Sequence, residues 1–261
     1  MKLQALISTM HQKKDDFSLL EKMNIHSDAI IINQCERNDF DVFNYNGREI
    51  KFFSFSERGV GLSRNNALLR ASHEISLFGD DDVRYVGDYE KSILNAFKEN
   101  PKADVIIFNL LSRNPKRSGL KIEKSYRVRW YNALKFGMAR VAIRTEKIRK
   151  KNIHFSLLFG GGAKYSCGED SIFLTDCLKN GLKIYTNTAI IGYVDQKEST
   201  WFTGYNEKFF YDKGALFATI SPRFGYLLSM QFVFRKYKTF KIDKKRREIL
   251  KWVLKGTKGI R

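Results

Sequence analysis

The chain has 261 residues, of which 43% are hydrophobic and 14% aromatic, so disordered and collagen-like classes are excluded. Its three cysteines are odd in number and lack CxxC spacing, which argues against a disulfide framework or a structural zinc site. The formal net charge of +19 predicts an acidic partner, either nucleic acid or an anionic membrane. The opening residues do not form a signal peptide, and no apolar run is long enough to cross a membrane. These features favour a cytoplasmic protein.

Short apolar runs alternate with helical patterns over residues 1–200, and the alternation predicts an α/β fold with a mostly parallel sheet. The three consecutive isoleucines at 30–32 are typical of a strand that is buried on both faces. Asn46-Gly47 suits the turn of a hairpin. In chain order we expect a strand at 3–8, a helix at 17–23, a strand at 28–33, a hairpin at 41–55, a helix after the loop at Gly59, a strand at 74–78, a helix at 89–100, strands at 105–110 and 139–143, a glycine-rich loop at 153–168, a helix at 169–179, and strands at 183–185 and 189–194.

The pattern changes near residue 200. From Trp201 onward, aromatic residues at helical spacing are mixed with basic ones. We therefore expect two parts, an α/β domain at residues 1–200 and a helical, basic extension at 201–261.

Three adjacent carboxylates, Asp80, Asp81 and Asp82, follow the strand at 74–78. Like charges this close repel, and a bound cation would relieve the repulsion. In parallel α/β sheets, ligands collect beyond the carboxyl ends of the strands, which is where this triplet falls. An acidic turn with a helix-capping role would also explain the triplet, which by itself leaves both interpretations open.

A second acidic pair, Glu169 and Asp170, opens a predicted helix, where capping alone could account for it. The combination of motifs is more specific than any one of them. The first βαβ unit and three motifs in this order resemble the family 2 glycosyltransferases over about residues 1–200: Gly61-Leu62-Ser63-Arg64-Asn65-Asn66, Phe78-Gly79-Asp80-Asp81-Asp82 and Gly168-Glu169-Asp170.

This resemblance implies a GT-A fold, which is Rossmann-like with helices flanking the sheet, and a DxD motif that falls on Asp80 and Asp82. Both residues would hold Mn²⁺ or Mg²⁺ on the donor diphosphate, where the ion acts as a Lewis acid. A UDP-sugar is the donor expected from the family. Donor-binding positions implied by the match are Thr9, Gln34, Arg58, Gly61, Ser63, Arg64, Asp80 and Asp81.

The resemblance also implies an inverting reaction in which Asp170 is the general base for the acceptor hydroxyl, with Glu169 as the alternative base or as an orienting group. Two stretches depart from the family pattern, Ser8-Thr9-Met10-His11 after the first strand and Asn33-Gln34-Cys35-Glu36 after the second. Asp195-Gln196 stands where some relatives have a metal-binding histidine. The glycines at 160–162 predict either a mobile lid or a tight structural loop.

The end of the chain is strongly basic, with twelve Lys and Arg against two acidic residues at 235–261. Apolar positions 242, 249, 250, 253 and 254 predict an amphipathic helix. It could lie on an anionic membrane with Trp252 at headgroup depth, or pack on its own domain or in a dimer. Membrane attachment would place the protein on the inner face of the cell membrane. It would also fit a lipid-linked or glycan acceptor in bacterial-type surface glycan assembly.

Two other functions fit parts of the sequence. The charge and interleaved aromatics could hold nucleic acid, although no recognised nucleic-acid motif is present. The acidic clusters could instead serve metal-dependent phosphoryl transfer. The fold without the transfer activity is a further alternative.

Overall fold

The computed structural model describes residues 1–114, 119–195, 204–240 and 244–260, and within these residues nine strands form one sheet. The strand order is β3-β4-β2-β1-β5-β8-β7-β9-β6. The strands are β1 (Leu3–Met10), β2 (Asp28–Gln34), β3 (Asp39–Tyr45), β4 (Arg48–Phe55), β5 (Ile75–Asp80), β6 (Val83–Tyr85), β7 (Val105–Ser112), β8 (Val141–Arg144) and β9 (Ile184–Val194).

The sheet is mostly parallel, as predicted. The strands β4, β2, β1 and β5 are adjacent and parallel, and β7 and β9 form a second parallel pair. The antiparallel strand β8 joins these two groups, while β3 and β6 run antiparallel at the two edges. The carboxyl ends of β1 and β5 therefore lie side by side, with Ser8 in register with Asp80.

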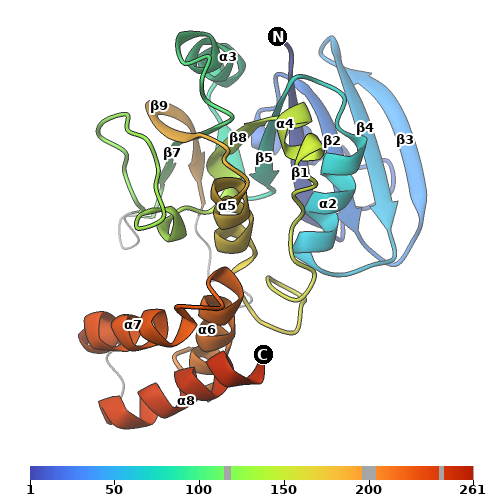
Figure 1. Ribbon diagram of the computed structural model, residues 1–261. Helices are drawn as coiled ribbons and strands as arrows, with labels where there is room; N and C mark the ends of the chain where they lie inside the picture. The colour runs from blue at the N-terminus through green and yellow to red at the C-terminus, as the bar shows by residue number, and fades with distance from the viewer. Residues whose placement is uncertain (115–118, 196–203, 241–243, 261) are drawn as a thin grey trace.

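Helices cover both faces of the sheet (Figure 1). One apolar cluster packs α1 (Ser18–Met23) and α3 (Tyr89–Glu99) on one face, and a second packs α2 (Val60–Arg70), α4 (Thr145–Lys150) and α5 (Glu169–Lys179) on the other. Successive residues of β2 alternate between the clusters, Ala29 and Ile31 in the first and Ile30 and Ile32 in the second. The prediction of a strand buried on both faces is confirmed.

The structure corrects the second half of the predicted sheet. The two strands expected at 183–185 and 189–194 are one strand, β9, because the polar residues between them are hydrogen-bonded. Thr186 N donates to the Tyr126 carbonyl at 2.9 Å, and the Asn109 amide donates to the Thr188 carbonyl at 3.0 Å. The short elements β6 and α4 were not predicted.

The C-terminal extension forms three helices, α6 (Glu207–Ile220), α7 (Gly225–Phe240) and α8 (Arg246–Gly259), grouped beyond one end of the sheet (Figure 1). The expected boundary near residue 200, with Trp201, lies outside the described residues, as does Ile242. A Cβ atom at Gly214 in α6 would collide with the Val253 carbonyl of α8, so the two backbones are in close contact. No helix in the described parts of the chain is both long and apolar enough to cross a bilayer.

The amphipathic helix predicted near the C-terminus is α8, and its apolar face is used inside the molecule. Ile249 and Val253 are fully buried in a cluster with Phe210 of α6 and Val233 of α7. The ring of Trp252 stacks on Phe210 with centroids 6.0 Å apart. These contacts match the interpretation in which the helix packs on its own chain, and Trp252 is partly buried by them.

Candidate active site

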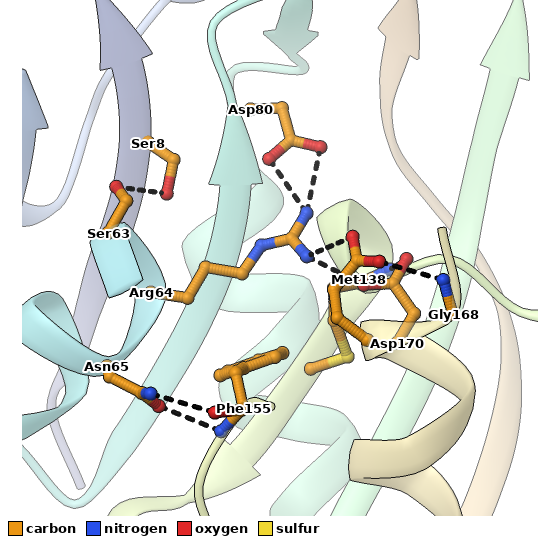
Figure 2. A network of polar contacts seen from close by, with 10 residues as sticks. Ser8, Ser63, Arg64, Asn65, Asp80, Met138, Phe155, Gly168 and Asp170 are labelled. Carbon is orange, nitrogen blue, oxygen red and sulfur yellow. Dashed lines mark hydrogen bonds and ion pairs between the residues drawn. The ribbon is translucent and has the colours of Figure 1, made fainter. Parts of the chain in front are cut away.

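Arg64 links the two acidic motifs at the end of β5 (Figure 2). Its Nη2 donates to Asp80 at 3.1 Å, and its Nη1 donates to Asp170 Oδ1 at 2.6 Å and to Glu169 Oε1 at 3.3 Å. The side chain is only 5% exposed. Burial alone would lower the pKa of Arg64, but the carboxylates of Asp170, Asp80 and Glu169 outweigh it and raise the pKa above its ordinary value. The guanidinium is therefore a permanent cation shared by three carboxylates.

Arg64 reaches this position because α2 packs closely against the loop at 153–168. Asn65 is bonded to Phe155 in both directions, donating to its carbonyl at 2.9 Å and accepting from its N–H at 2.8 Å. The Phe155 ring lies 5.5 Å from the guanidinium carbon of Arg64. Gly61 allows the close approach, because a Cβ there would lie 2.5 Å from the Ser156 carbonyl oxygen.

Substituting Gly61 by Ala should push this loop away from α2. We expect the free energy of unfolding to fall by about 1–3 kcal/mol, the usual cost of overpacking, together with weaker donor binding. Thermal denaturation and nucleotide titration would measure both effects. Gly87→Ala is the matched control, since a Cβ at Gly87 meets nothing within 4 Å. Equal effects of the two substitutions would contradict the proposed packing role of Gly61.

The two acidic residues at the start of α5 have different hydrogen-bond partners. Glu169 Oε2 accepts from the Gly168 N–H at 3.0 Å, a local capping contact. Asp170 Oδ2 accepts from the Met138 N–H at 3.0 Å, and the Asp170 side chain is 24% exposed against 12% for Glu169. Burial raises the pKa of Asp170 to about 7, against the opposing effect of Arg64. Asp170 thus combines access to solvent with a pKa suited to proton transfer near neutrality.

The three residues of the acidic triplet have different surroundings. Asp80 faces Arg64, and Asp81 turns toward Thr9, whose hydroxyl donates to it at 2.7 Å. Lys22 also donates to the Asp81 carbonyl at 2.8 Å. Burial, reinforced by the charges of Asp80 and Asp81, raises the pKa of Asp82 to about 6. Asp82 is therefore the triplet residue whose negative charge is the least well compensated.

The carboxylates of the acidic triplet suit a hard divalent cation. Carboxylate oxygens are the ligands that Mg²⁺ and Mn²⁺ prefer, and the raised pKa of Asp82 marks a position where added positive charge would be stabilising. Within the described residues, no three carboxylate, imidazole or thiol side chains are grouped as a complete metal site.

The remaining predicted donor-binding residues lie around the ends of β1, β2 and β4, and several have structural partners. Gln34 is bonded to Gly59 in both directions, each bond at 3.1 Å. Ser63 donates to the Ser8 hydroxyl at 2.9 Å, which ties α2 to β1. Arg58 donates to the Cys35 carbonyl at 3.2 Å and pairs with Glu36. These contacts position the loop that leads into α2.

The glycine-rich loop is packed against the start of α2. The Val60 N–H donates to the Gly161 carbonyl at 3.0 Å, and a Cβ at Gly162 would lie 3.1 Å from Gly59. Gly160 and Gly162 have positive φ angles of 109° and 81°, a conformation that favours glycine. These contacts match the tight structural loop among the two interpretations of this segment.

Sequence reasoning missed three contributors to this region. The buried Tyr85 hydroxyl has no hydrogen-bond partner in the described structure, and it lies where a side chain at Gly79 would collide with it. The Met138 N–H orients Asp170, and the Asp195 N–H donates to the Asp82 carbonyl at 3.2 Å. Pairing of β6 with β9 creates the last contact, and a three-residue strand leaves no periodic signal in the sequence.

The sheet order, the helices on both faces and the acidic cluster at the ends of β1 and β5 define the GT-A glycosyltransferase fold that the motif order predicted. No family model matches the chain, and no curated protein matches its sequence. The similarity to known proteins is found by comparing the structure with solved structures.

S. aureus TarS 1–349 in complex with UDP-GlcNAc superposes with a TM-score of 0.67 at 16% identity, covering 97% of this chain and 80% of that one. A longer TarS chain gives a TM-score of 0.59 at 16% identity, with 95% of this chain covering 41% of that chain. The mannosyltransferase PcManGT from Pyrobaculum calidifontis, in complex with GDP-Man and Mn²⁺, gives 0.51 at 10% identity, covering 99% and 86% of the two chains. At these identities the comparisons establish the fold.

Proposed function

We propose that this chain is an inverting glycosyltransferase that moves a sugar from a nucleotide diphosphate donor to an acceptor hydroxyl. The observation that carries the proposal is the convergence on Arg64 of Asp80, from the strand-end triplet, and Asp170, from the start of α5. A carboxylate cluster that would hold a metal ion for the donor diphosphate and a candidate base are thus held together by one buried cation. UDP is the nucleotide we favour, since TarS, with a TM-score of 0.67, was solved with UDP-GlcNAc.

Asp82, with Asp80, would hold Mn²⁺ or Mg²⁺ when it is bound, and the ion would neutralise charge on the leaving diphosphate. The protein's own residues determine the rest of the geometry. Arg64 keeps Asp80 and Asp170 at a fixed separation, and Asp81 is held away from them by Thr9. Such preorganisation limits the reorganisation required during reaction.

Asp170 is the residue we assign as general base, in preference to Glu169. One of its oxygens faces Arg64 and the other faces the Met138 N–H, which fixes the carboxylate plane. Each oxygen retains a second lone pair that can accept the proton of an acceptor hydroxyl. The acceptor oxygen would then attack the anomeric carbon from the side opposite the nucleotide, which inverts the configuration.

The pH dependence of transfer should report this base. Because burial raises the pKa of Asp170 to about 7, its reactive carboxylate form predominates above that pH and is lost as the pH falls through 7. We expect kcat/KM for transfer to decline on the acid side with a midpoint near pH 7, and donor affinity to fall only at lower pH, as Asp82, whose pKa is raised to about 6, becomes protonated. A flat profile between pH 5 and 8 would contradict Asp170 as base.

The function itself is tested with a panel of UDP-, GDP- and other nucleotide sugars, each with Mn²⁺ or Mg²⁺, by thermal stabilisation and slow donor hydrolysis. At least one donor should stabilise the protein in a metal-dependent manner. Asp82→Asn should remove the metal-dependent part, whereas Asp88→Asn, the loss of an exposed carboxylate at the start of α3, should not. Failure of every donor, combined with cleavage of phosphodiester substrates, would favour a phosphoryl-transfer enzyme instead.

A further inference from the structure

The outer face of α7 is apolar although it is exposed. The helix packs inward through Gly225, Ser229, Val233 and Phe240. On the opposite side, Leu227, Met230 and Phe234 are 58%, 38% and 56% exposed, and helical spacing aligns them in one stripe. We name these three residues the α7 stripe. These exposed fractions show that the packing of α6 and α8 leaves much of the stripe uncovered.

Positive charge lies near the C-terminal end of the α7 stripe. Lys238 is exposed four residues after Phe234, on the same side of the helix, and Arg235 and Lys236 are exposed on its other sides. The start of α8 lies against the end of α7, because the Tyr237 hydroxyl donates to the Lys244 carbonyl at 2.8 Å and the Arg246 guanidinium lies 5.3 Å from the Phe234 ring. The described residues from 223 to 260 contain eleven Lys and Arg against one acidic residue, Glu248.

An apolar stripe next to basic residues limits the kind of partner that can bind this surface. A second copy of the same face would bring two strongly positive surfaces together, which repel. Nucleic acid would satisfy the cations, but Leu227 and Met230 offer no ring on which a base can stack, and the Phe234 ring already lies 5.3 Å from the Arg246 guanidinium. An anionic lipid surface matches both features, since acyl chains accept the apolar stripe while headgroup phosphates meet Lys and Arg.

We propose that the α7 stripe and the basic residues that begin α8 bind an anionic lipid bilayer, with α7 lying along the membrane surface. The contact face is on α7, and α8 contributes cations while its apolar face stays packed on α6. The proposal does not depend on glycosyl transfer, because it concerns a surface formed by the C-terminal helices. It would keep the chain next to acceptors that are anchored in a membrane.

The test uses the full chain and vesicles of phosphatidylcholine with or without phosphatidylglycerol, in a sedimentation assay. The wild type should bind the anionic vesicles and release from them as salt is raised. Leu227→Glu combined with Phe234→Glu should weaken binding by at least about tenfold, since both the apolar contact and the charge match are lost. The matched control is Val42→Glu combined with Leu69→Glu, which adds the same charge at side chains that are 51% and 73% exposed elsewhere; it should bind far more tightly than the α7 variant.

Any of three other outcomes would overturn the proposal. Equal binding by the α7 variant and its control would mean that net charge alone drives attachment. Absence of vesicle binding by the wild type would exclude the lipid surface. Concentration-dependent dimerisation that the α7 variant abolishes, without vesicle binding, would assign the face to a second copy. Circular dichroism and thermal melting of both variants would verify that they fold.

Discussion

Replacing Arg64 with Met should lower the free energy of unfolding by about 3–5 kcal/mol, the usual cost of breaking a buried ion pair by removing one partner. The loss would leave Asp80, Glu169 and Asp170 facing one another without the cation that now contacts all three. We also expect transfer activity to fall below detection, because the base and the strand-end carboxylate would no longer be held in place. Urea unfolding and a transfer assay would measure the two effects.

Two further variants separate this role from a general need for arginine on α2. Arg70→Met, on the same helix, removes a guanidinium that lies 4.8 Å from the Phe53 ring, and it should cost less than about 1 kcal/mol. Adding Asp170→Asn to Arg64→Met should recover part of the lost stability, since it removes one of the uncompensated charges. Strictly additive effects of the two substitutions would contradict the shared ion-pair network.

Asp170→Asn should reduce the transfer rate by about 10²–10⁴-fold, the range for loss of a general base, while donor binding stays close to that of the wild type. The amide keeps the size of the side chain, and its single oxygen can still accept from the Met138 N–H, while the bond from Arg64 is lost. Asp80 and Glu169 still pair with Arg64 after this substitution, so the melting temperature should fall less than in Arg64→Met. Steady-state kinetics and nucleotide titration would distinguish these effects.

Glu169→Gln is the comparison, because Glu169 shares Arg64 but its second oxygen is engaged with the neighbouring Gly168 N–H. We expect it to slow transfer much less than Asp170→Asn. The reverse order, with activity abolished by Glu169→Gln and retained by Asp170→Asn, would assign the base to Glu169.

The fold could be predicted from sequence where a local pattern determines the structure. Three consecutive isoleucines are typical of a strand buried on both faces, and Ile30 to Ile32 lie in one. The sequence predicts two strands where the structure has the single strand β9, because Thr186, Asn187 and Thr188 are polar. The residues that form hydrogen bonds with this stretch, such as Asn109, come from a distant part of the chain. The local composition of a segment does not reveal hydrogen-bond partners that lie far away in the sequence.

The same distinction holds for the site. The motifs indicated which residue types gather at the sheet edge, but the pairing of Arg64 with Asp170 joins positions 106 residues apart. That pairing depends on α5 packing against β5, where Phe173 and Phe78 meet with ring centroids 5.8 Å apart. Likewise, the pattern of α8 predicted an apolar face without showing what covers it. The features of the sequence that allow α6 and α8 to pack closely are Gly214 and Gly256, where a Cβ atom would collide with the other helix.

The most direct test of the account is a crystal structure of the chain with UDP and Mn²⁺, in which anomalous scattering locates the metal. We expect a manganese peak at the carboxylate of Asp82, with the diphosphate of the nucleotide bound to the same ion. A nucleotide bound elsewhere, with no anomalous peak at the acidic triplet, would contradict the assignment of this cluster as a donor site.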